Sequence, residues 1–141
     1  MISKYHCALY RSTECPNGNW TRFNNNCYWL NDLKLEKIEA KRVCKSANST
    51  LASIRSSNEM DFLEQNILNG IDDNIWIGGG SQSNSGWYWK DGSKFGEYEN
   101  WAANQPNNPA IRPICVYLKA RSHKWGDAYC SDYEFPSICM Y

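Results

Sequence analysis

The sequence has no excess of charge of either sign, because 15 basic residues balance 15 acidic ones over 141 residues. A protein that binds nucleic acid through its overall field is strongly basic, so the charge balance predicts no nucleic-acid partner. The sequence also lacks an apolar run long enough to cross a bilayer. Its first residues do not resemble a secretory signal, and we expect any signal or membrane stem to lie outside these residues.

Histidine is scarce, and the sequence has no CxxC pair. The two histidines, His6 and His123, are isolated, so the spacing of a structural zinc site is missing. Seven cysteines then favour disulfides, which place the protein outside the reducing cytosol. Two N-glycosylation sequons, which begin at Asn19 and Asn48, agree with an extracellular glycoprotein.

A catalytic constellation is also lacking. If the cysteines are paired, no Cys/His or Ser/His/Asp set can be assembled. Glu97 and Glu99 would share one face of a strand, and we interpret them as solvated surface. The acidic pair Asp72-Asp73 is interpreted as part of a turn. We therefore predict that the protein is not an enzyme.

The length fits one domain. Residues 1–14 show no periodic pattern and are interpreted as a tail or stem, and residues 15–141 as the domain. Cys15 and Cys27 enclose a turn signal, Pro16-Asn17-Gly18, and aromatic residues typical of strands. This pattern predicts a hairpin stapled by the two cysteines.

Two segments have the periodicity of helices. Apolar residues from Leu33 to Ala47 recur near i, i+3, i+4 spacing, which predicts a helix with Cys44 pointing inward. Ser56 and Glu59 form a capping box, which predicts a second helix to about Leu68. The charged residues predicted to lie mostly on the other faces of the first helix are Glu36, Lys37, Lys41 and Lys45.

Short strands and one long loop complete the predicted α+β organisation. Apolar runs predict strands at residues 51–54, 74–79, 114–118 and 135–141. Residues 87–92 predict one arm of a hairpin with an Asp-Gly turn. Residues 80–113 contain no helical period. A loop of this length inside a compact domain usually carries function, so we expect the site there.

Several motifs occur together in the second half of the sequence. The run Trp76–Gly79 precedes the pair Asn100-Trp101 and the triplet Gln105-Pro106-Asn107, and Trp125-Gly126-Asp127 stands just before Cys130. This constellation resembles the C-type lectin-like domain, in its long form with an N-terminal hairpin. The family has a fold of two helices, short antiparallel sheets and a long loop region. The resemblance also implies a secreted module or the ectodomain of a membrane protein, with recognition as its function.

The resemblance covers roughly Cys15 to Tyr141 and implies three intrachain disulfides. Six cysteines allow fifteen connectivities, so their spacing alone does not choose among them. The pairs that the family implies are Cys15–Cys27, Cys44–Cys139 and Cys115–Cys130.

Sugar-binding members of this family hold a calcium ion in the long loop, and the ligand set is depleted here. The triplet keeps Gln105 and Asn107, and Asp127 is the one carboxylate that remains. Pro113 and Gly126 stand where the family has two further ligands. Calcium takes six to eight oxygens and binds more tightly as charged ligands are added. We therefore predict no resident metal, with weak calcium binding at Gln105, Asn107 and Asp127 left open.

Three interpretations of the loop follow. The first is a glycan or glycoprotein ligand, bound with little or no calcium dependence through Gln105, Asn107 and Asp127. In that case Arg112 or Arg121 could place a cation near the former ion position. The second is a calcium-independent protein-binding surface of a receptor or ligand ectodomain. The third is a triplet that serves only as a turn.

Cys7 has no partner in this pairing scheme. An odd cysteine in a secreted chain is either a free thiol or part of an intermolecular bridge. We predict a disulfide-linked dimer through Cys7, formed with a second copy or with a different chain. Two linked weak sites would gain avidity for a target that presents repeated ligands.

Overall fold

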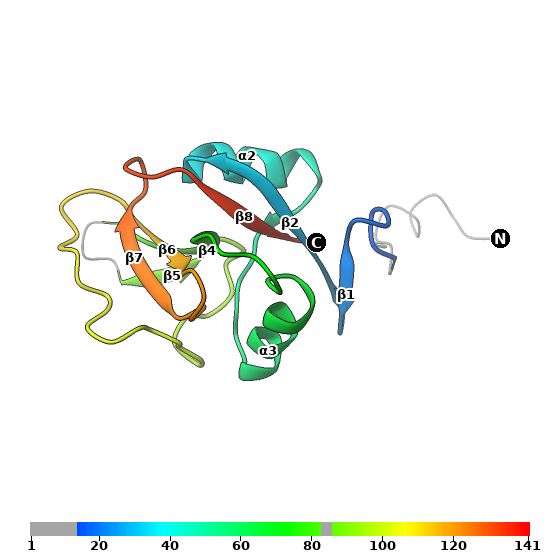
Figure 1. The fold of residues 1–141 in the computed structure, drawn as a ribbon. Helices are drawn as coiled ribbons and strands as arrows, with labels where there is room; N and C mark the ends of the chain where they lie inside the picture. Colours follow the sequence, from blue (N-terminus) through cyan, green and yellow to red (C-terminus); the bar gives the residue numbers. More distant parts are fainter. Residues whose placement is uncertain (1–13, 83–85) are drawn as a thin grey trace.

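The computed structural model describes residues 14–82 and 86–141. Cys7 lies outside the described residues, so the dimer through Cys7 stays a prediction. Within the described part, no helix is long and apolar enough to span a membrane. Figure 1 shows α2 and α3 on opposite sides of the pair β2 and β8, with β4 to β7 and the long loop to one side and β1 to the other.

The described residues form eight strands and two helices. In chain order they are β1 (Thr21–Phe23), β2 (Asn26–Leu35), α2 (Lys37–Ser46), β3 (Thr50–Leu51), α3 (Ser57–Asn66), β4 (Ile75–Ser81), β5 (Trp87–Trp89), β6 (Ile114–Leu118), β7 (Trp125–Tyr129) and β8 (Phe135–Met140). The strands join in the order β1-β2-β8-β4-β6-β7, with β3 on β8 and β5 on β4. Pairing is antiparallel except between β4 and β8, so the predicted α+β fold is confirmed with a mixed sheet.

The two ends of the domain meet in the pair β2 and β8. Tyr28 lies opposite Met140, and the backbone N–H of Cys27 donates to the carbonyl of Tyr141 at 3.0 Å. The predicted N-terminal hairpin is confirmed, and it is formed by β1 and β2. Its turn includes Asn24, with φ at 52°, a conformation that asparagine tolerates better than most residues. The hairpin therefore extends the sheet at its β2 edge.

The predicted start of the first helix was wrong, because α2 begins at Lys37 and not at Leu33. Residues as far as Leu35 continue β2, where Leu35 pairs with Phe135 of β8. Pairing with a distant strand overrides a local helical period. Leu33 of β2 and Ile38 of α2 are 58% and 54% exposed, although the periodicity assigned both to the buried face of one helix.

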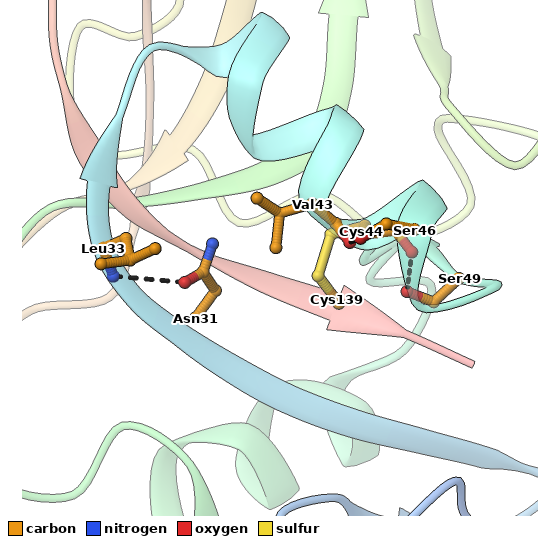
Figure 2. The surroundings of a disulfide bond; sticks show 7 residues. All are labelled: Asn31, Leu33, Val43, Cys44, Ser46, Ser49 and Cys139. Atoms are coloured by element: carbon orange, nitrogen blue, oxygen red, sulfur yellow. Dashed lines mark hydrogen bonds between the residues drawn. A yellow bond between two sulfur atoms is a disulfide. The ribbon is translucent and has the colours of Figure 1, made fainter.

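The disulfide Cys44–Cys139 ties α2 to β8 (Figure 2), and Cys44 points inward as predicted. Beside it, Ser49 donates to the carbonyl oxygen of Cys44 through both its N–H (2.9 Å) and its hydroxyl (2.7 Å). These bonds add to the one that the Cys44 carbonyl accepts from the N–H of Ala47, at 3.0 Å, where the helix ends. The other two implied bridges, Cys15–Cys27 and Cys115–Cys130, are also present.

The second helix, α3, begins as predicted. The Ser56 hydroxyl accepts the N–H of Glu59 at 3.1 Å, which caps the helix. The Glu59 carboxylate accepts from the N–H of Arg55, one residue before the expected Ser56. Its other oxygen accepts the hydroxyl of Tyr28 at 3.1 Å, which links α3 to β2. The helix ends at Asn66, slightly earlier than predicted.

The long loop rests on buried tryptophans. Trp125 makes edge contacts with Trp89 and Trp101, at centroid distances of 5.5 and 5.6 Å. The backbone N–H of Trp125 donates to Asn100, and its carbonyl accepts from Ala102. The loop is therefore attached to β7 by backbone hydrogen bonds on both sides of Trp101.

The prediction for residues 87–92 needs a correction. β5 does form one arm of a hairpin, but its partner is β4, which precedes it in the chain. The Asp91-Gly92 turn follows β5 and does not connect the two arms. The connection between β4 and β5 includes residues outside the described ranges.

Candidate functional site

The triplet Gln105-Pro106-Asn107 forms a tight turn in the long loop. The Gln105–Pro106 peptide bond is cis. The N–H of Gln105 donates to the carbonyl of Ala102 at 3.1 Å, and Asn104 before it has a positive φ of 64°. We call residues 105–108 the cis-proline turn.

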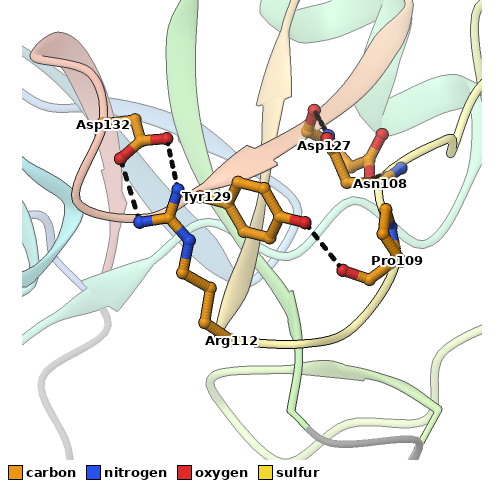
Figure 3. Close-up of polar contacts among 6 residues, drawn as sticks. All are labelled: Asn108, Pro109, Arg112, Asp127, Tyr129 and Asp132. Carbon is orange, nitrogen blue, oxygen red and sulfur yellow. Dashed lines mark hydrogen bonds and ion pairs between the residues drawn. The ribbon is translucent and has the colours of Figure 1, made fainter.

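Asp127 of β7 holds this turn. Its Oδ1 accepts the N–H of Asn107 and its Oδ2 accepts the N–H of Asn108, each at 2.9 Å. The Asn108 Nδ2 donates to the Asp127 carbonyl at 2.9 Å (Figure 3 shows the pair), and the Asp127 N–H donates to Gln105 Oε1 at 3.3 Å. The Asp127 side chain is only 5% exposed. Both carboxylate oxygens therefore have backbone donors within the protein.

The polar groups that face solvent at this turn are few. Asn107 is exposed, whereas Gln105 is half-buried and uses its Oε1 in the contact with Asp127. A side-chain amide can donate and accept hydrogen bonds with a sugar hydroxyl. The turn thus presents neutral amides, and the carboxylate lies beneath them.

The residues present do not fit a calcium ion. A Cβ at Gly126 would lie 2.7 Å from the Tyr117 ring, so the phenol fills the space that a side-chain ligand at this position would need. Pro113 has no side-chain oxygen, and its carbonyl accepts the N–H of Cys130. Among residues 14–82 and 86–141, no cluster of three or more His, Cys, Asp or Glu could hold a metal. Calcium takes six to eight oxygens, and both Asp127 carboxylate oxygens and Gln105 Oε1 already accept backbone N–H groups.

The family model that matches this chain is the lectin C-type domain, over residues 34–141. The chain belongs to the C-type lectin domain family. Ladderlectin of Oncorhynchus mykiss is 34% identical over 134 residues, which cover 92% of this chain and 69% of that protein. The low affinity immunoglobulin epsilon Fc receptor of Mus musculus is 36% identical over 126 residues, which cover 89% of this chain but 36% of the receptor.

Solved structures of C-type lectin domains are also similar. The herring type II antifreeze protein superposes with a TM-score of 0.79 at 31% identity, covering 90% of this chain and 98% of that one. The cow carbohydrate-recognition domain of CD23, solved with a GlcNAc2Man3 oligosaccharide, also gives 0.79 at 27% identity, covering 92% and 97%. The fold is thus shared by proteins whose names indicate different ligands.

The two candidate arginines do not join the cis-proline turn of this lectin domain. Arg112 pairs with Asp132 through two hydrogen bonds of 3.2 and 2.8 Å and lies 4.1 Å from the Tyr129 ring. In Figure 3 the Tyr129 ring separates that ion pair from Asn108 and Asp127, while the Tyr129 hydroxyl donates to the Pro109 carbonyl at 2.9 Å.

Arg121 lies in the connection between β6 and β7, where it pairs with Asp72 at 2.9 Å. The hydrogen bond from Arg121 holds the pKa of the Asp72 carboxyl below its ordinary value. Both side chains are exposed, so this pair contributes little to stability. Because Arg121 is paired with Asp72, it does not place its charge at the cis-proline turn.

Sequence reasoning missed one residue of interest, Lys37, which was assigned to a solvent face. It is 7% exposed, its Nζ donates to the Gly79 carbonyl at 2.9 Å, and it lies 5.7 Å from the Trp76 ring. Burial, followed by the nearby charge of Lys90, lowers its pKa to about 7. The run of three glycines in β4 could have indicated this, since glycine often marks a strand that another group approaches closely.

Proposed function

We propose that this lectin domain binds a neutral glycan at the cis-proline turn with little or no dependence on calcium. The observation that carries the proposal is the pair of hydrogen bonds from Asn107 and Asn108 to Asp127. In a calcium-dependent site the ion would both neutralise the carboxylate and fix the loop. Here the backbone N–H groups of Asn107 and Asn108 donate to the Asp127 carboxylate and also fix the loop to β7, so the turn can keep its shape without an ion.

The ligand chemistry follows from what the turn exposes. Asn107 and Gln105 offer amide donors and acceptors but no net charge, which suits hydroxyl or acetamido groups. Two structural relatives support this choice, because the cow CD23 domain was solved with an oligosaccharide and the SPL-1 domain, 28% identical with a TM-score of 0.76, as a GlcNAc complex.

An extracellular setting is part of the proposal. Three disulfides cross-link the described part of the chain, and such bonds persist in oxidising compartments. The sequon residues Asn19 and Asn48 are both exposed and accessible to a glycosylating enzyme. We propose a secreted protein or an ectodomain whose function is recognition rather than catalysis.

A protein ligand is the second candidate, and one feature of the loop favours it. Ile111 is 80% exposed, close in sequence to the Arg112–Asp132 ion pair. An exposed aliphatic residue beside a fixed arginine is a combination found in protein-binding surfaces, where arginine and apolar groups concentrate. This surface would not require the cis-proline turn.

The test is binding of immobilised neutral glycans by the wild type and by Asn107→Ala, each with calcium and with chelator. We expect binding that survives chelation and falls about fivefold to tenfold in Asn107→Ala, the cost of roughly one hydrogen bond. Asn58→Ala, at another exposed asparagine in the first turn of α3, is the matched control and should bind as the wild type does.

Loss of binding on chelation would overturn the calcium independence. Unchanged binding by Asn107→Ala would move the glycan site away from the turn. If no neutral glycan binds, the protein-ligand proposal takes precedence, and Ile111→Asp then becomes the variant that should abolish capture of the partner.

A further inference from the structure

A second candidate site lies away from the cis-proline turn. A cavity of about 360 Å³ opens between the start of α2, the glycine run of β4 and the segments that flank the Cys115–Cys130 bridge. The volume is at the small end of the range for sites that bind small molecules. Its wall includes Lys37, Lys41, Gly79, Lys90, Arg112 and Cys130.

The charges around this cavity are unbalanced, although the chain as a whole is neutral. Three lysines line it, and Glu36 is the one carboxylate in the lining. The ion pairs of the described residues include none of these lysines. Arg112 is already neutralised by Asp132. Within the part of the chain that the structure describes, the cavity therefore carries positive charge that Glu36 compensates only in part.

The charge of Lys90 acts on Lys37, and the charge of Lys41 acts on Lys90. Burial and the charge of Lys90 lower the pKa of Lys37, and burial and the adjacent Lys41 ammonium lower that of Lys90. Like charges brought together and partly removed from water disfavour their own ionised forms. A bound anion would offset the repulsion, because it supplies an opposite charge to the lysines that line the cavity.

Hydrogen-bond donors in the cavity outnumber their acceptors. The Lys37 ammonium carries three N–H groups, and one of them donates to Gly79. The side chain of the N-cap residue Glu36 makes no capping bond, so it satisfies none of the first N–H groups of α2. The positive end of the helix dipole adds to the field of the lysines at this position.

We propose that this cavity binds a tetrahedral oxyanion, a sulfate or a phosphate, either free or as the monoester of a small ligand. Such a group has enough acceptor oxygens to engage Lys37, Lys41 and Lys90 together, and charge-assisted bonds of this type are stronger than neutral ones. The Gly79 backbone lines the cavity, and its carbonyl fixes the Lys37 ammonium there.

The first experiment is titration calorimetry with inorganic sulfate at low ionic strength. We expect the double variant Lys41→Gln with Lys90→Gln to bind sulfate at least tenfold more weakly than the wild type. Both residues are outside the buried core, and the single variants provide a second comparison, each with an intermediate loss. Lys45→Gln removes one charge from an exposed position of the same helix and should stay within twofold of the wild type.

Equal weakening by Lys45→Gln and by Lys41→Gln would overturn the proposal, because it would show a general effect of net charge. The absence of sulfate and phosphate binding at tens of millimolar would overturn it as well. Neither result concerns Asn107, so failure of this site and failure of the neutral-glycan site are distinguishable.

The source of the oxyanion is resolved by comparing three probes: inorganic sulfate, N-acetylglucosamine 6-sulfate and unmodified N-acetylglucosamine. Tighter binding of the sulfated sugar than of sulfate assigns an ester ligand, and equal binding assigns a free anion. Binding of the unmodified sugar that competes with sulfate would contradict an oxyanion site.

The pH dependence gives an independent reading. The titratable residues that line the cavity with Lys37 are Glu36, which precedes α2, Lys41 of α2, Tyr88 of β5, Lys90 directly after β5, and Arg112 before β6. With a pKa of about 7, Lys37 loses its charge between pH 6 and pH 8.5 in the free protein. Sulfate affinity should therefore fall severalfold over this range in the wild type, and an affinity that rises with pH would contradict the proposal.

Discussion

The cis-proline turn differs from the cavity lined by Lys37, Lys41 and Lys90, which we call the lysine cavity, in how far its polar groups have partners within the protein. At the turn, Asp127 is buried with two backbone donors, and Gln105 accepts a third N–H. In the cavity, Lys37 is equally buried but has one acceptor, and two more lysines stand beside it without a carboxylate partner. The hydrogen bonds of Asp127 at the turn are satisfied within the protein. The lysines of the cavity, by our proposal, gain a partner of opposite charge when an anion binds.

The comparison shows why the residue types of a motif are an incomplete guide to its chemistry. Asp127 keeps the identity of a calcium ligand, yet its oxygens are used to hold the loop. Tyr117 packs against Gly126 and fills the space that a side chain at position 126 would need. Unsatisfied charge, not resemblance to a motif, marks the lysine cavity.

The largest expected effect on the free energy of unfolding comes from removing the disulfides that stabilise the fold around both regions. The double variant Cys44→Ala with Cys139→Ala opens a loop with a sequence separation of 95 residues, and it should lower the free energy of unfolding by about 4–5 kcal/mol. The double variant of Cys115 and Cys130, with a separation of 15, should cost about 3 kcal/mol. Urea unfolding measures both, and the reverse ranking would contradict the loop-closure explanation.

The second prediction concerns the pH dependence of stability that the buried Lys37 causes. Its folded pKa of about 7 lies below its ordinary value of 10.5, so between these pH values the unfolded chain binds a proton that the folded chain does not. Stability therefore rises with pH across this window. Relative to Lys37→Met, the wild type should gain about 3 kcal/mol between pH 7 and pH 9.5.

The control for this comparison is Lys45→Met, at an exposed position of α2. Its stability should stay parallel to that of the wild type from pH 7 to pH 9.5 in urea unfolding. If the free energy of unfolding of Lys37→Met changes with pH as that of the wild type does, Lys37 is solvated in solution. The cavity would then contain no buried lysine that lacks a charge partner.

A third and smaller loss of stability is expected when the hydrogen bonds that hold the cis-proline turn are removed. Asp127→Ala removes the acceptor of two backbone N–H groups and should lower the free energy of unfolding by about 2 kcal/mol, with faster amide exchange at Asn107 and Asn108. Asp132→Ala, which removes an exposed partner of Arg112, should cost at most about 1 kcal/mol. Equal costs for the two variants would show that Asp127 does not hold the turn.

Local signals predicted the parts of the fold that local contacts determine. The cap of α3 was readable because Ser56 and Glu59 are three residues apart and contact each other. The start of α2 was not, because the strand that extends β2 to Leu35 pairs with Phe135, which lies at the other end of the chain. The family resemblance supplied the three disulfide pairs, which spacing alone left open.

The same division applies to the candidate sites. Gln105, Asn107 and Asp127 were found from motifs, and the structure does bring them together. Their mutual hydrogen bonds could not be predicted, because a residue type does not show whether its polar atoms are already occupied. Burial of Lys37 depends on Gly79, 42 residues away, and no helical period contains that information.

The most direct test of the central claim, that Asp127 holds the cis-proline turn without an ion, is the melting temperature with millimolar calcium and with chelator. The account predicts agreement within about a degree, because no differential binding to the folded state occurs. A rise of several degrees with calcium that disappears in Asp127→Ala would contradict the claim, because it would show that the carboxylate serves an ion rather than the two N–H groups.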